Sequence, residues 1–393
     1  MAALDVAPLF EPFQIGRLRL RNRFVLPAMQ VGFVEGCGPS QRMIDYLRAR
    51  AEGGTALIYS ESCAPDHPSS YWQPVFCVLS KQSEGGWARV VDAVKGAGAC
   101  FFLQLWHPGA QRVPSPGFTH ADYPSLSPSG LLQEGRGNGR AMTTSEMDDI
   151  KASYVRAAET AKRLGADGVE LHCAHGYLMD QVLWAETNVR GDGYGGAALA
   201  DRARFPLEVV AAMRAAVSPG FPISLRFSQF KEADYGARVF ATPEELADFT
   251  ALAKTAGVDM LNVSSRRFAK PEWPELHATR GIAGWTKLVG GLPVMTTGSV
   301  GLDKDMFADL FDNADPALRL AADLAELVRR FAAGEFDLVG VGRMQIANPD
   351  FVAKLASGRL DALRLYRKAV DLGHLFGRLE PGLIEEGRKI TAD

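Results

Sequence analysis

Short runs of apolar residues recur along the chain and alternate with longer amphipathic stretches. Eight of these runs are rich in Val, Ile, Leu or Phe, with little alternation between apolar and polar positions. That pattern is typical of parallel strands whose two faces are both buried. The predicted strands lie at residues 24–26, 56–59, 100–105, 168–171, 222–227, 260–263, 293–297 and 338–341.

Helical periodicity fills most of the intervals between these runs. The sequence Thr242-Pro243-Glu244-Glu245 predicts a capping box with proline at the first helical position. Gly165, Gly257 and Gly334 stand where helix C-caps are expected. The predicted helices lie at residues 41–52, 86–95, 145–164, 199–217, 242–256 and 317–333.

Strands that alternate with helices predict a parallel sheet, and eight such units predict an α/β fold of the (β/α)8 TIM-barrel type. Each unit takes about 45 residues, against roughly 30 in a minimal barrel. We expect one domain over residues 1–393, with the surplus in insertions. Residues 111–143, with four prolines and five glycines, predict a capping loop after the third strand, and residues 268–285 predict a second insertion. Residues 13–20 predict an N-terminal hairpin that closes the barrel floor.

Composition narrows the class of protein further. Lys and Arg number 43 against 46 Asp and Glu, so the net charge of −3 argues against nucleic acid as a partner. No basic and apolar leader precedes residue 13, and no apolar run is long enough to span a bilayer, which predicts a cytoplasmic protein without a membrane partner. The cysteines contain no C-x-x-C pair and are odd in number, so no disulfide framework, zinc site or iron–sulfur cluster is expected. They are Cys37, Cys63, Cys77, Cys100 and Cys173.

The fourth predicted strand is followed by His172, His175 and Tyr177, and barrel active sites lie at the C-terminal ends of the strands. Two imidazole N–H groups can converge on one oxygen and polarise a carbonyl or nitro group. The Tyr177 hydroxyl could donate a proton to carbon beside it. The same residues could instead be satisfied polar groups at a strand end, and both interpretations stay open here.

Three other strand ends carry candidate binding groups. Gln104 and Trp106 follow the third strand, where an amide could pair with a heterocycle edge. Arg226 lies inside the fifth apolar run, where a charge is costly unless it is paired or faces a ligand. The loops after strands seven and eight often bind phosphate in such barrels. Here these loops contain Gly298, Ser299, Gly342 and Arg343.

Taken together, these residues resemble the old yellow enzyme family of FMN-dependent oxidoreductases over residues 9–359. The resemblance rests on segments spread along the whole barrel rather than on one motif. These segments are Leu9-Phe10-Glu11-Pro12-Phe13-Gln14-Ile15-Gly16, Gln104-Leu105-Trp106-His107, Glu170-Leu171-His172-Cys173-Ala174-His175-Gly176-Tyr177, Thr187-Asn188-Val189-Arg190, Tyr194-Gly195-Gly196, Arg202-Ala203-Arg204-Phe205 and Gly340-Val341-Gly342-Arg343.

The resemblance implies FMN at the barrel mouth and NADH or NADPH as the reductant. It implies that His172 and His175 bind the substrate oxygen, that Tyr177 protonates the α-carbon of an activated alkene, and that Trp106 contacts substrate. The substrate would be an enone, a nitroalkene or a quinone-like compound. The implied FMN-binding residues are Pro27, Ala28, Met29, Gln30, Ser62, Gln104, Arg226, Gly298, Ser299, Gly342 and Arg343.

Two positions outside these segments depart from the usual pattern of the family. Many relatives have Thr or Cys where Gln30 stands; Gln30 can still donate a hydrogen bond near the flavin N5/O4 edge. Glu61 stands beside Ser62 where small residues are usual, and its role is left open. The cysteines of the iron–sulfur domain found in longer relatives are missing, so no such domain is expected.

Alternative functions remain at this stage. Another FMN-barrel activity, of the amine demethylase or dienoyl-thioester reductase type, would use the same fold. A metal hydrolase would want more ligands at other strand ends, where His107 is the only further histidine. A flavin-binding sensor without catalysis would not need the two histidines and the tyrosine together. A homo-oligomer is compatible with each of these.

Overall fold

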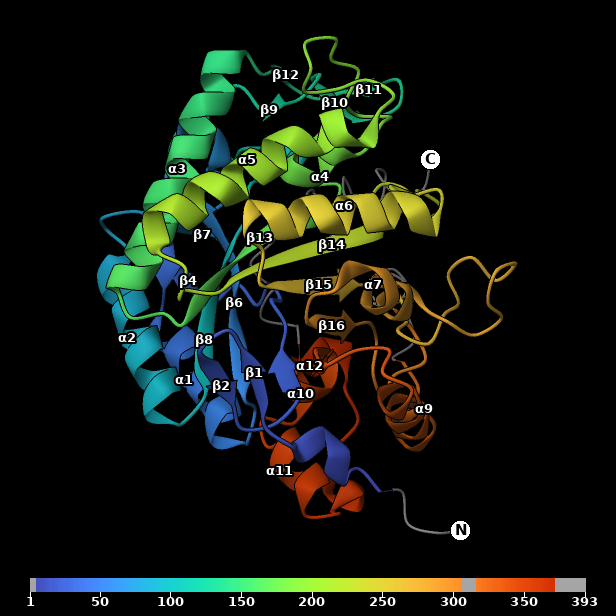
Figure 1. Ribbon diagram of the computed structural model, residues 1–393. Coiled ribbons are helices and arrows are strands. Elements are labelled where there is room, and N and C mark those ends of the chain that lie inside the picture. The colour runs from blue at the N-terminus through green and yellow to red at the C-terminus, as the bar shows by residue number, and fades with distance from the viewer. Residues whose placement is uncertain (1–4, 306–315, 372–393) are drawn as a thin grey trace.

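A computed structural model of the chain, which describes residues 5–305 and 316–371, contains a closed barrel of eight parallel strands (Figure 1). Each strand pairs with the next, and β17 pairs with β3 to close the ring. The eight predicted strands are confirmed. The prediction of one domain over residues 1–393 includes residues 1–4, 306–315 and 372–393, which lie outside the described residues. The barrel strands are β3 (Phe24–Leu26), β6 (Leu57–Pro65), β8 (Cys100–Leu105), β13 (Gly168–His175), β14 (Ile223–Lys231), β15 (Met260–Ser264), β16 (Val294–Thr297) and β17 (Leu338–Gly340).

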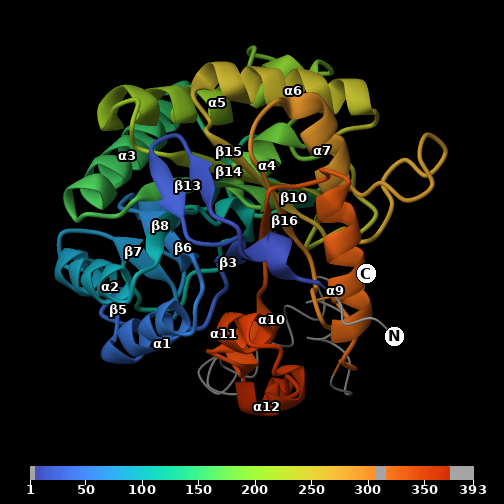
Figure 2. The same cartoon turned by 60° about the horizontal axis from the view of Figure 1, so that its bottom comes forward.

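Helices surround the barrel, and Figure 2 shows them outside the ring of strands. The long ones are α1 (Gln41–Glu52), α2 (Glu84–Gly96), α3 (Thr144–Arg163), α5 (Leu199–Val217), α6 (Pro243–Ala256), α7 (Ile282–Gly290) and α9 (Leu320–Ala332). The short ones are α4 (Leu178–Leu183), α10 (Arg343–Ala347), α11 (Phe351–Ala356) and α12 (Lys368–Asp371), with 3-10 turns η1 (Ala7–Phe10), η2 (Pro68–Ser70), η3 (Gly109–Gln111) and η4 (Leu360–Ala362).

The predicted helices are confirmed to within three residues at each end, but α7 was not predicted. Its first residues lie in the end of the predicted 268–285 insertion. The helix was missed because Gly and Trp within residues 281–285 obscure the helical period. The predicted capping box at α6 is half formed: the Thr242 hydroxyl accepts from the N–H of Glu245, but the Glu245 carboxylate turns to the N–H of Ala241.

The N-terminal hairpin fills the bottom of the barrel, as predicted. Strands β1 (Phe13–Ile15) and β2 (Leu18–Leu20) pair antiparallel, and Ile15 and Leu20 are fully buried. They pack on side chains that point into the barrel from the starts of its strands, so the N-terminal end is closed by apolar contacts and only the C-terminal end is left to open. These side chains are Val25, Leu57, Tyr59, Phe102, Met260, Met295 and Leu338.

Smaller strands lie at the C-terminal end of the barrel. A ninth strand, β7 (Cys77–Leu79), extends the sheet by pairing with the end of β6. A further hairpin joins β4 (Val34–Glu35) and β5 (Gly38–Pro39). The 111–143 segment forms β9 (Leu126–Ser127), β10 (Leu131–Gln133), β11 (Arg136–Gly137) and β12 (Arg140–Ala141).

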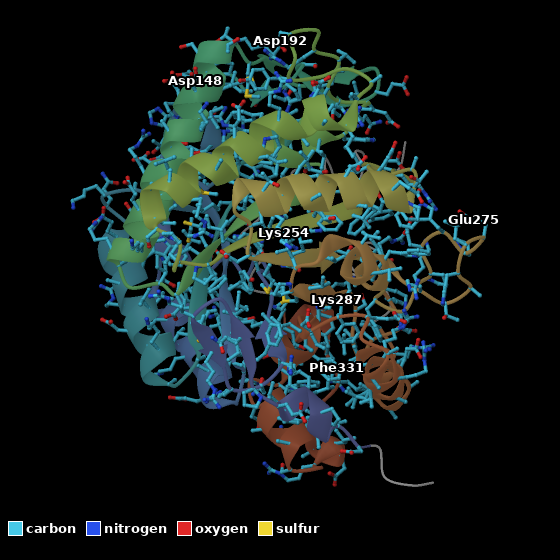
Figure 3. All side chains as sticks on the ribbon, in the orientation of Figure 1. Asp148, Asp192, Lys254, Glu275, Lys287 and Phe331 are labelled. Carbon is cyan, nitrogen blue, oxygen red and sulfur yellow. The ribbon has the colours of Figure 1, made fainter. Side chains whose placement is uncertain are left out.

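The 111–143 segment is held together by one buried arginine. The guanidinium of Arg112 donates to the backbone carbonyls of Tyr71 (2.6 Å), Tyr123 (2.5 Å) and His120 (2.6 Å). These three charge-assisted hydrogen bonds fix the path of the segment and tie it to Tyr71. By contrast, the segment between β15 and α7 projects away from the barrel with Glu275 exposed on it (Figure 3).

Within the described residues, no helix is long and apolar enough to cross a membrane.

Candidate active site

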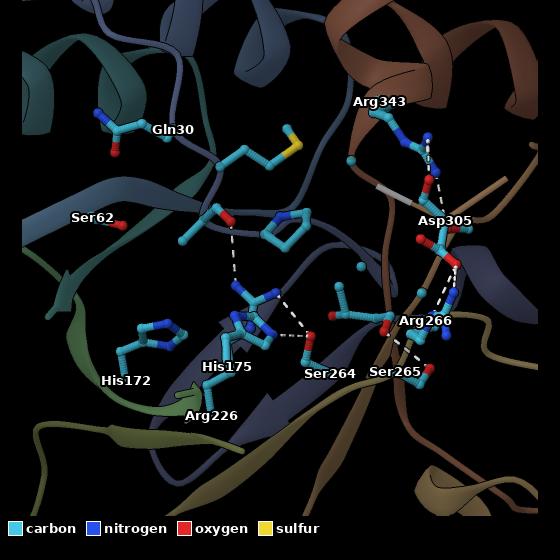
Figure 4. Close-up of a pocket in the computed structure, with 18 of the residues that line it drawn as sticks. Gln30, Ser62, His172, His175, Arg226, Ser264, Ser265, Arg266, Asp305 and Arg343 are labelled. Carbon is cyan, nitrogen blue, oxygen red and sulfur yellow. Dashed lines mark hydrogen bonds and ion pairs between the residues drawn. The ribbon is translucent and has the colours of Figure 1, made fainter. Parts of the chain in front are cut away.

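A cavity of about 450 Å³ opens at the C-terminal end of the barrel, where Figure 4 shows the side chains that line it. The predicted site residues are brought together there from seven different strands or the loops that follow them. Trp106 is the exception. The lining includes Pro27, Ala28, Met29, Gln30, Ser62, Gln104, His172, His175, Tyr177, Arg226, Gly298, Ser299, Gly342 and Arg343.

The two histidines converge because β13 is irregular at its end. Residues three apart in a regular strand face opposite sides, but the register of β13 against β14 shifts between Cys173 and His175. His175 adopts φ 66°, which strains a residue other than glycine, and its ring centroid lies 5.1 Å from that of His172. Hydrogen bonds from the His175 N–H to the Ser228 hydroxyl (3.0 Å) and from the Gln111 amide to the His175 carbonyl (3.2 Å) hold this conformation.

Both imidazoles are kept neutral by their surroundings. Burial in the barrel lowers the pKa of His172 and of His175 well below the ordinary histidine range, and the Arg226 cation lowers both further. A neutral imidazole still has one N–H to donate. The pair can therefore bind a substrate oxygen by hydrogen bonding over the whole physiological pH range without changing charge.

A chain of hydrogen bonds links the buried cation to His175. Arg226 donates to the carbonyl of Ala28 and to the hydroxyl of Ser264, both at 3.2 Å, and that hydroxyl contacts His175 Nε2 at 2.8 Å (Figure 4). Among the described residues, Arg226 Nε and His172 Nδ1 are buried with no partner. Because both side chains line the cavity, a ligand bound there could satisfy these two atoms.

A buried carboxylate, Glu170, organises the layer beneath the cavity. It accepts hydrogen bonds from the amide of Gln104 (2.8 Å), the hydroxyl of Ser224 (3.0 Å) and the amide of Asn262 (2.8 Å). Burial raises its pKa, and the Arg226 cation opposes that rise. No role was predicted for Glu170, although, like Arg226, it is a charged residue inside an apolar strand.

The loop after β3 is held by hydrogen bonds from other segments of the chain. One N–H of the Gln30 amide donates to the carbonyl of Val75 at 2.6 Å, while its oxygen is buried without a partner in the described part. Glu61 does not line the cavity. Its carboxylate accepts the N–H groups of Val31 (3.0 Å) and Gly32 (3.1 Å) and thereby fixes the loop that carries Gln30.

Glu61 gives a stability prediction. Burial raises its pKa from 4.5 to about 7, so the folded state holds a proton that the unfolded state has lost between these values. Its stabilising contribution is full below the unfolded pKa and is lost as pH rises through 7. The stability of the wild type relative to E61Q, measured as the difference in their free energies of unfolding, should decrease by about 2–3 kcal/mol from about pH 5 to about pH 8. Urea titrations at both pH values measure it; a constant difference would contradict the assignment.

The loops after β16 and β17 form a cradle without room for side chains. A Cβ at Gly298 would lie 2.5 Å from the Ser265 hydroxyl and 2.6 Å from its carbonyl, and one at Gly342 would lie 2.8 Å from Met29 Sδ. The Arg343 guanidinium donates to the hydroxyl of Ser299 at 2.9 Å. Glycine backbone without side chains and the Arg343 cation therefore lie at this end of the cavity, the combination that permits close approach of a phosphate group.

The crowding at Gly298 predicts that G298A disturbs this cradle. An added methyl group must displace the backbone of Ser265 or that of Phe268, whose N–H lies 2.8 Å from the ideal Cβ. We expect at least a tenfold loss in FMN affinity, which corresponds to about 1.4 kcal/mol. Fluorescence titration of the cofactor-free protein with FMN measures it. G85A in α2, where no atom lies within 4 Å of the added Cβ, is the matched control and should bind FMN like the wild type.

Trp106 does not line the cavity, contrary to the prediction that it contacts substrate. It is 1% exposed and packs behind Phe76, with ring centroids 5.0 Å apart, and against the edge of Tyr177 at 5.2 Å. Its role is to support these two rings. None of the residues 111–143 lines the cavity either, and that segment reaches the site through the Gln111 amide.

Other lining residues were not predicted. Glu232 accepts a hydrogen bond from the Tyr177 hydroxyl at 3.0 Å. It was missed because β14 continues to Lys231, four residues beyond its apolar run. The same reason hid Phe230, whereas Ser264, Ser265 and Arg266 carry no sequence signal beyond lying at the end of β15. In the described part of the chain no three His, Cys, Asp or Glu side chains are grouped to hold a metal ion.

Comparisons with known proteins agree with this fold and site. The model of the NADH:flavin oxidoreductase / NADH oxidase family matches residues 8–315. The chain is 34% identical over 368 residues to an NADH oxidase of Thermoanaerobacter brockii (91% of this chain, 52% of the relative). It is 31% identical over 359 residues to 12-oxophytodienoate reductase 2 of Arabidopsis thaliana (88% of each). Morphinone reductase in complex with tetrahydroNAD superposes with a TM-score of 0.73 at 26% identity, covering 92% of this chain and 93% of that chain.

The barrel, its cavity and these similarities place the chain in a family of flavin oxidoreductases. The chain belongs to the NADH:flavin oxidoreductase / NADH oxidase family, that of the old yellow enzyme, whose cofactor is FMN. It spans about half the length of the NADH oxidase that it matches.

The residues present fit FMN. Arg226 Nε is a buried cationic donor and the Gln30 oxygen a buried acceptor. Neither has a partner among residues 5–305 and 316–371, and both side chains line the cavity. The glycine cradle near Arg343 leaves backbone accessible at the far end. The cavity volume also lies in the usual range for a cofactor site.

Proposed function

We propose that the protein reduces the activated C=C bond of α,β-unsaturated carbonyl or nitro compounds with NADH or NADPH as the reductant. The observation that carries the proposal is the convergence of two neutral imidazoles and a phenol on one cavity wall. The rings of His172 and His175 lie 5.1 Å apart, and the Tyr177 ring lies 5.5 Å from that of His172. Bound FMN supplies hydride to the β-carbon.

The protein groups then act on the substrate in separate ways. His172 and His175 donate hydrogen bonds to the carbonyl or nitro oxygen, where negative charge develops as the β-carbon gains hydride. Tyr177 donates its proton to the α-carbon. Phe76 and Phe230 line the same cavity and exclude water from the reacting carbons.

The binding roles follow from position. Gln104, oriented by Glu170, and Arg226 would contact the pyrimidine edge of the flavin, where a cation favours the reduced, anionic form. The glycine cradle with Ser299 and Arg343 would bind the phosphate. The segment 27–30 and Ser62 would line the ring system.

The test starts with the absorption spectrum and identification of the released cofactor. Purified protein is then assayed anaerobically with NADH or NADPH and 2-cyclohexenone, a nitroalkene or a quinone, with cyclohexanone as the control that lacks the alkene. We expect FMN and conversion of the activated alkenes alone. A protein that reduces none of these compounds, and that oxidises NADH or NADPH only once oxygen is admitted, would contradict the proposal and favour an oxidase.

A further inference from the structure

Glu232 is a second acid in the cavity, bonded to the hydroxyl that we propose as the proton donor. It directly follows β14, and its Oε2 accepts from the Tyr177 hydroxyl at 3.0 Å. Its own backbone N–H donates to the carbonyl of His175 at 3.2 Å. Glu232 and Tyr177 both line the cavity, so the carboxyl group contacts the proposed proton donor from within the same cavity.

A buried ion pair fixes the two backbones that carry this contact. Lys231 Nζ lies 2.7 Å from Asp180 Oδ1, and both side chains are fully buried. The other carboxylate oxygen of Asp180 accepts the N–H of Gly176 at 2.6 Å. Lys231 precedes Glu232, and Gly176 precedes Tyr177, so the pair ties the end of β14 to the start of α4. A buried pair of this kind holds a single arrangement because breaking it leaves an uncompensated charge.

The ionisable groups around Glu232, together with its burial, set the pKa of its carboxyl group. The ionisable groups that face it in the described part are Tyr177 at the start of α4, Arg226 of β14 and Tyr235 of its own loop. Lys231 is turned away to Asp180. Burial raises the pKa of Glu232 to about 7, against the opposing effects of the Tyr177 hydrogen bond and the Arg226 cation.

On the basis of the proposed function, we propose that Glu232 is a relay residue that returns a proton to Tyr177 after each turnover. The Tyr177 O–H bond breaks as its proton forms the C–H bond at the substrate α-carbon, which leaves a phenolate. The carboxylic acid of Glu232 gives its proton to that oxygen, and water at the cavity mouth reprotonates the carboxylate. The relay moves protons only, because the electron pair for the reduction arrives with the hydride.

The relay predicts a pH profile. Glu232 holds a transferable proton below about pH 7 and has lost it above, so the rate of alkene reduction should fall as pH rises through 7. E232Q keeps the size of the side chain and its contact with Tyr177 but has no proton to give. We expect E232Q to be about tenfold slower than the wild type at about pH 6 and to show no step near pH 7.

E61Q is the matched control, because Glu61 also has a pKa of about 7 but bonds to the N–H groups of Val31 and Gly32. In E61Q the rate of alkene reduction should still fall as pH rises through 7. Infrared titration of the oxidised protein, without substrate, should show two carboxylic acid contributions that disappear with a midpoint near pH 7, one missing in E232Q and the other missing in E61Q. A protein that reduces no activated alkene would overturn the proposed function and the relay with it. A step that persists in an active E232Q variant would overturn the relay alone.

Discussion

Replacement of Tyr177 by Phe is expected to slow alkene reduction by about 10²–10⁴-fold, the usual contribution of a positioned general acid. Burial raises the pKa of the Tyr177 phenol well above its usual value, and the neighbouring Glu232 raises it further. The phenol therefore stays protonated at neutral pH and can act as a donor. Reduction of the flavin by NADH or NADPH needs no proton from this hydroxyl, so its rate in Y177F should match that of the wild type.

The two half-reactions are measured separately by anaerobic stopped-flow absorbance. Y154F is the matched control: Tyr154 is a fully buried tyrosine of α3 whose hydroxyl has no partner in the described structure. It should leave both half-reactions unchanged. Equal losses in the two half-reactions of Y177F would mean that Tyr177 has a structural role and is not the proton donor.

Replacement of Arg226 by Gln is expected to weaken FMN binding by about 10- to 100-fold. The change removes a buried, charge-assisted donor whose Nε has no partner within the described chain, and such hydrogen bonds contribute about 1.5–3 kcal/mol. The midpoint potential of the remaining bound FMN should also fall, because the cation that favours the reduced anionic form is gone. Equilibrium dialysis gives the affinity, and titration with a redox dye gives the potential.

A general loss of stability has to be separated from a loss of cofactor contacts in R226Q. Arg50 is equally buried, but it donates to the backbone carbonyls of Tyr46, Gln345 and Ile346 outside the cavity. R50Q should lower the thermal midpoint and keep the potential of bound FMN. An unchanged potential in R226Q would show that Arg226 does not face the flavin.

The barrel could be predicted from the sequence because its strands are buried on both faces and so appear as uninterrupted apolar runs. The ends of the strands were harder to predict. Strand β14 continues from its apolar run to Lys231, because Ser228 and Lys231 find partners inside the protein. The sequence alone does not show that these polar side chains have partners inside the protein, which is why Glu232 was overlooked.

The candidate site was predicted as a set of residues, but several orientations depend on contacts between distant segments. Gln30 is held by the carbonyl of Val75, 45 residues away, so its donor could not be assigned from the loop alone. Trp106 lies one layer behind the cavity because Phe76 stacks in front of it. The convergence of His172 and His175 needs a register shift that only the pairing with β14 reveals.

The most direct measurement of the central claim is a single turnover. Protein reduced with one equivalent of NADH or NADPH is mixed anaerobically with 2-cyclohexenone, and the absorbance of oxidised FMN is followed while the product is quantified. The account predicts that the oxidised spectrum returns with one equivalent of cyclohexanone per flavin. A flavin that stays reduced with this enone and with a nitroalkene, yet reoxidises when oxygen is admitted, would contradict it.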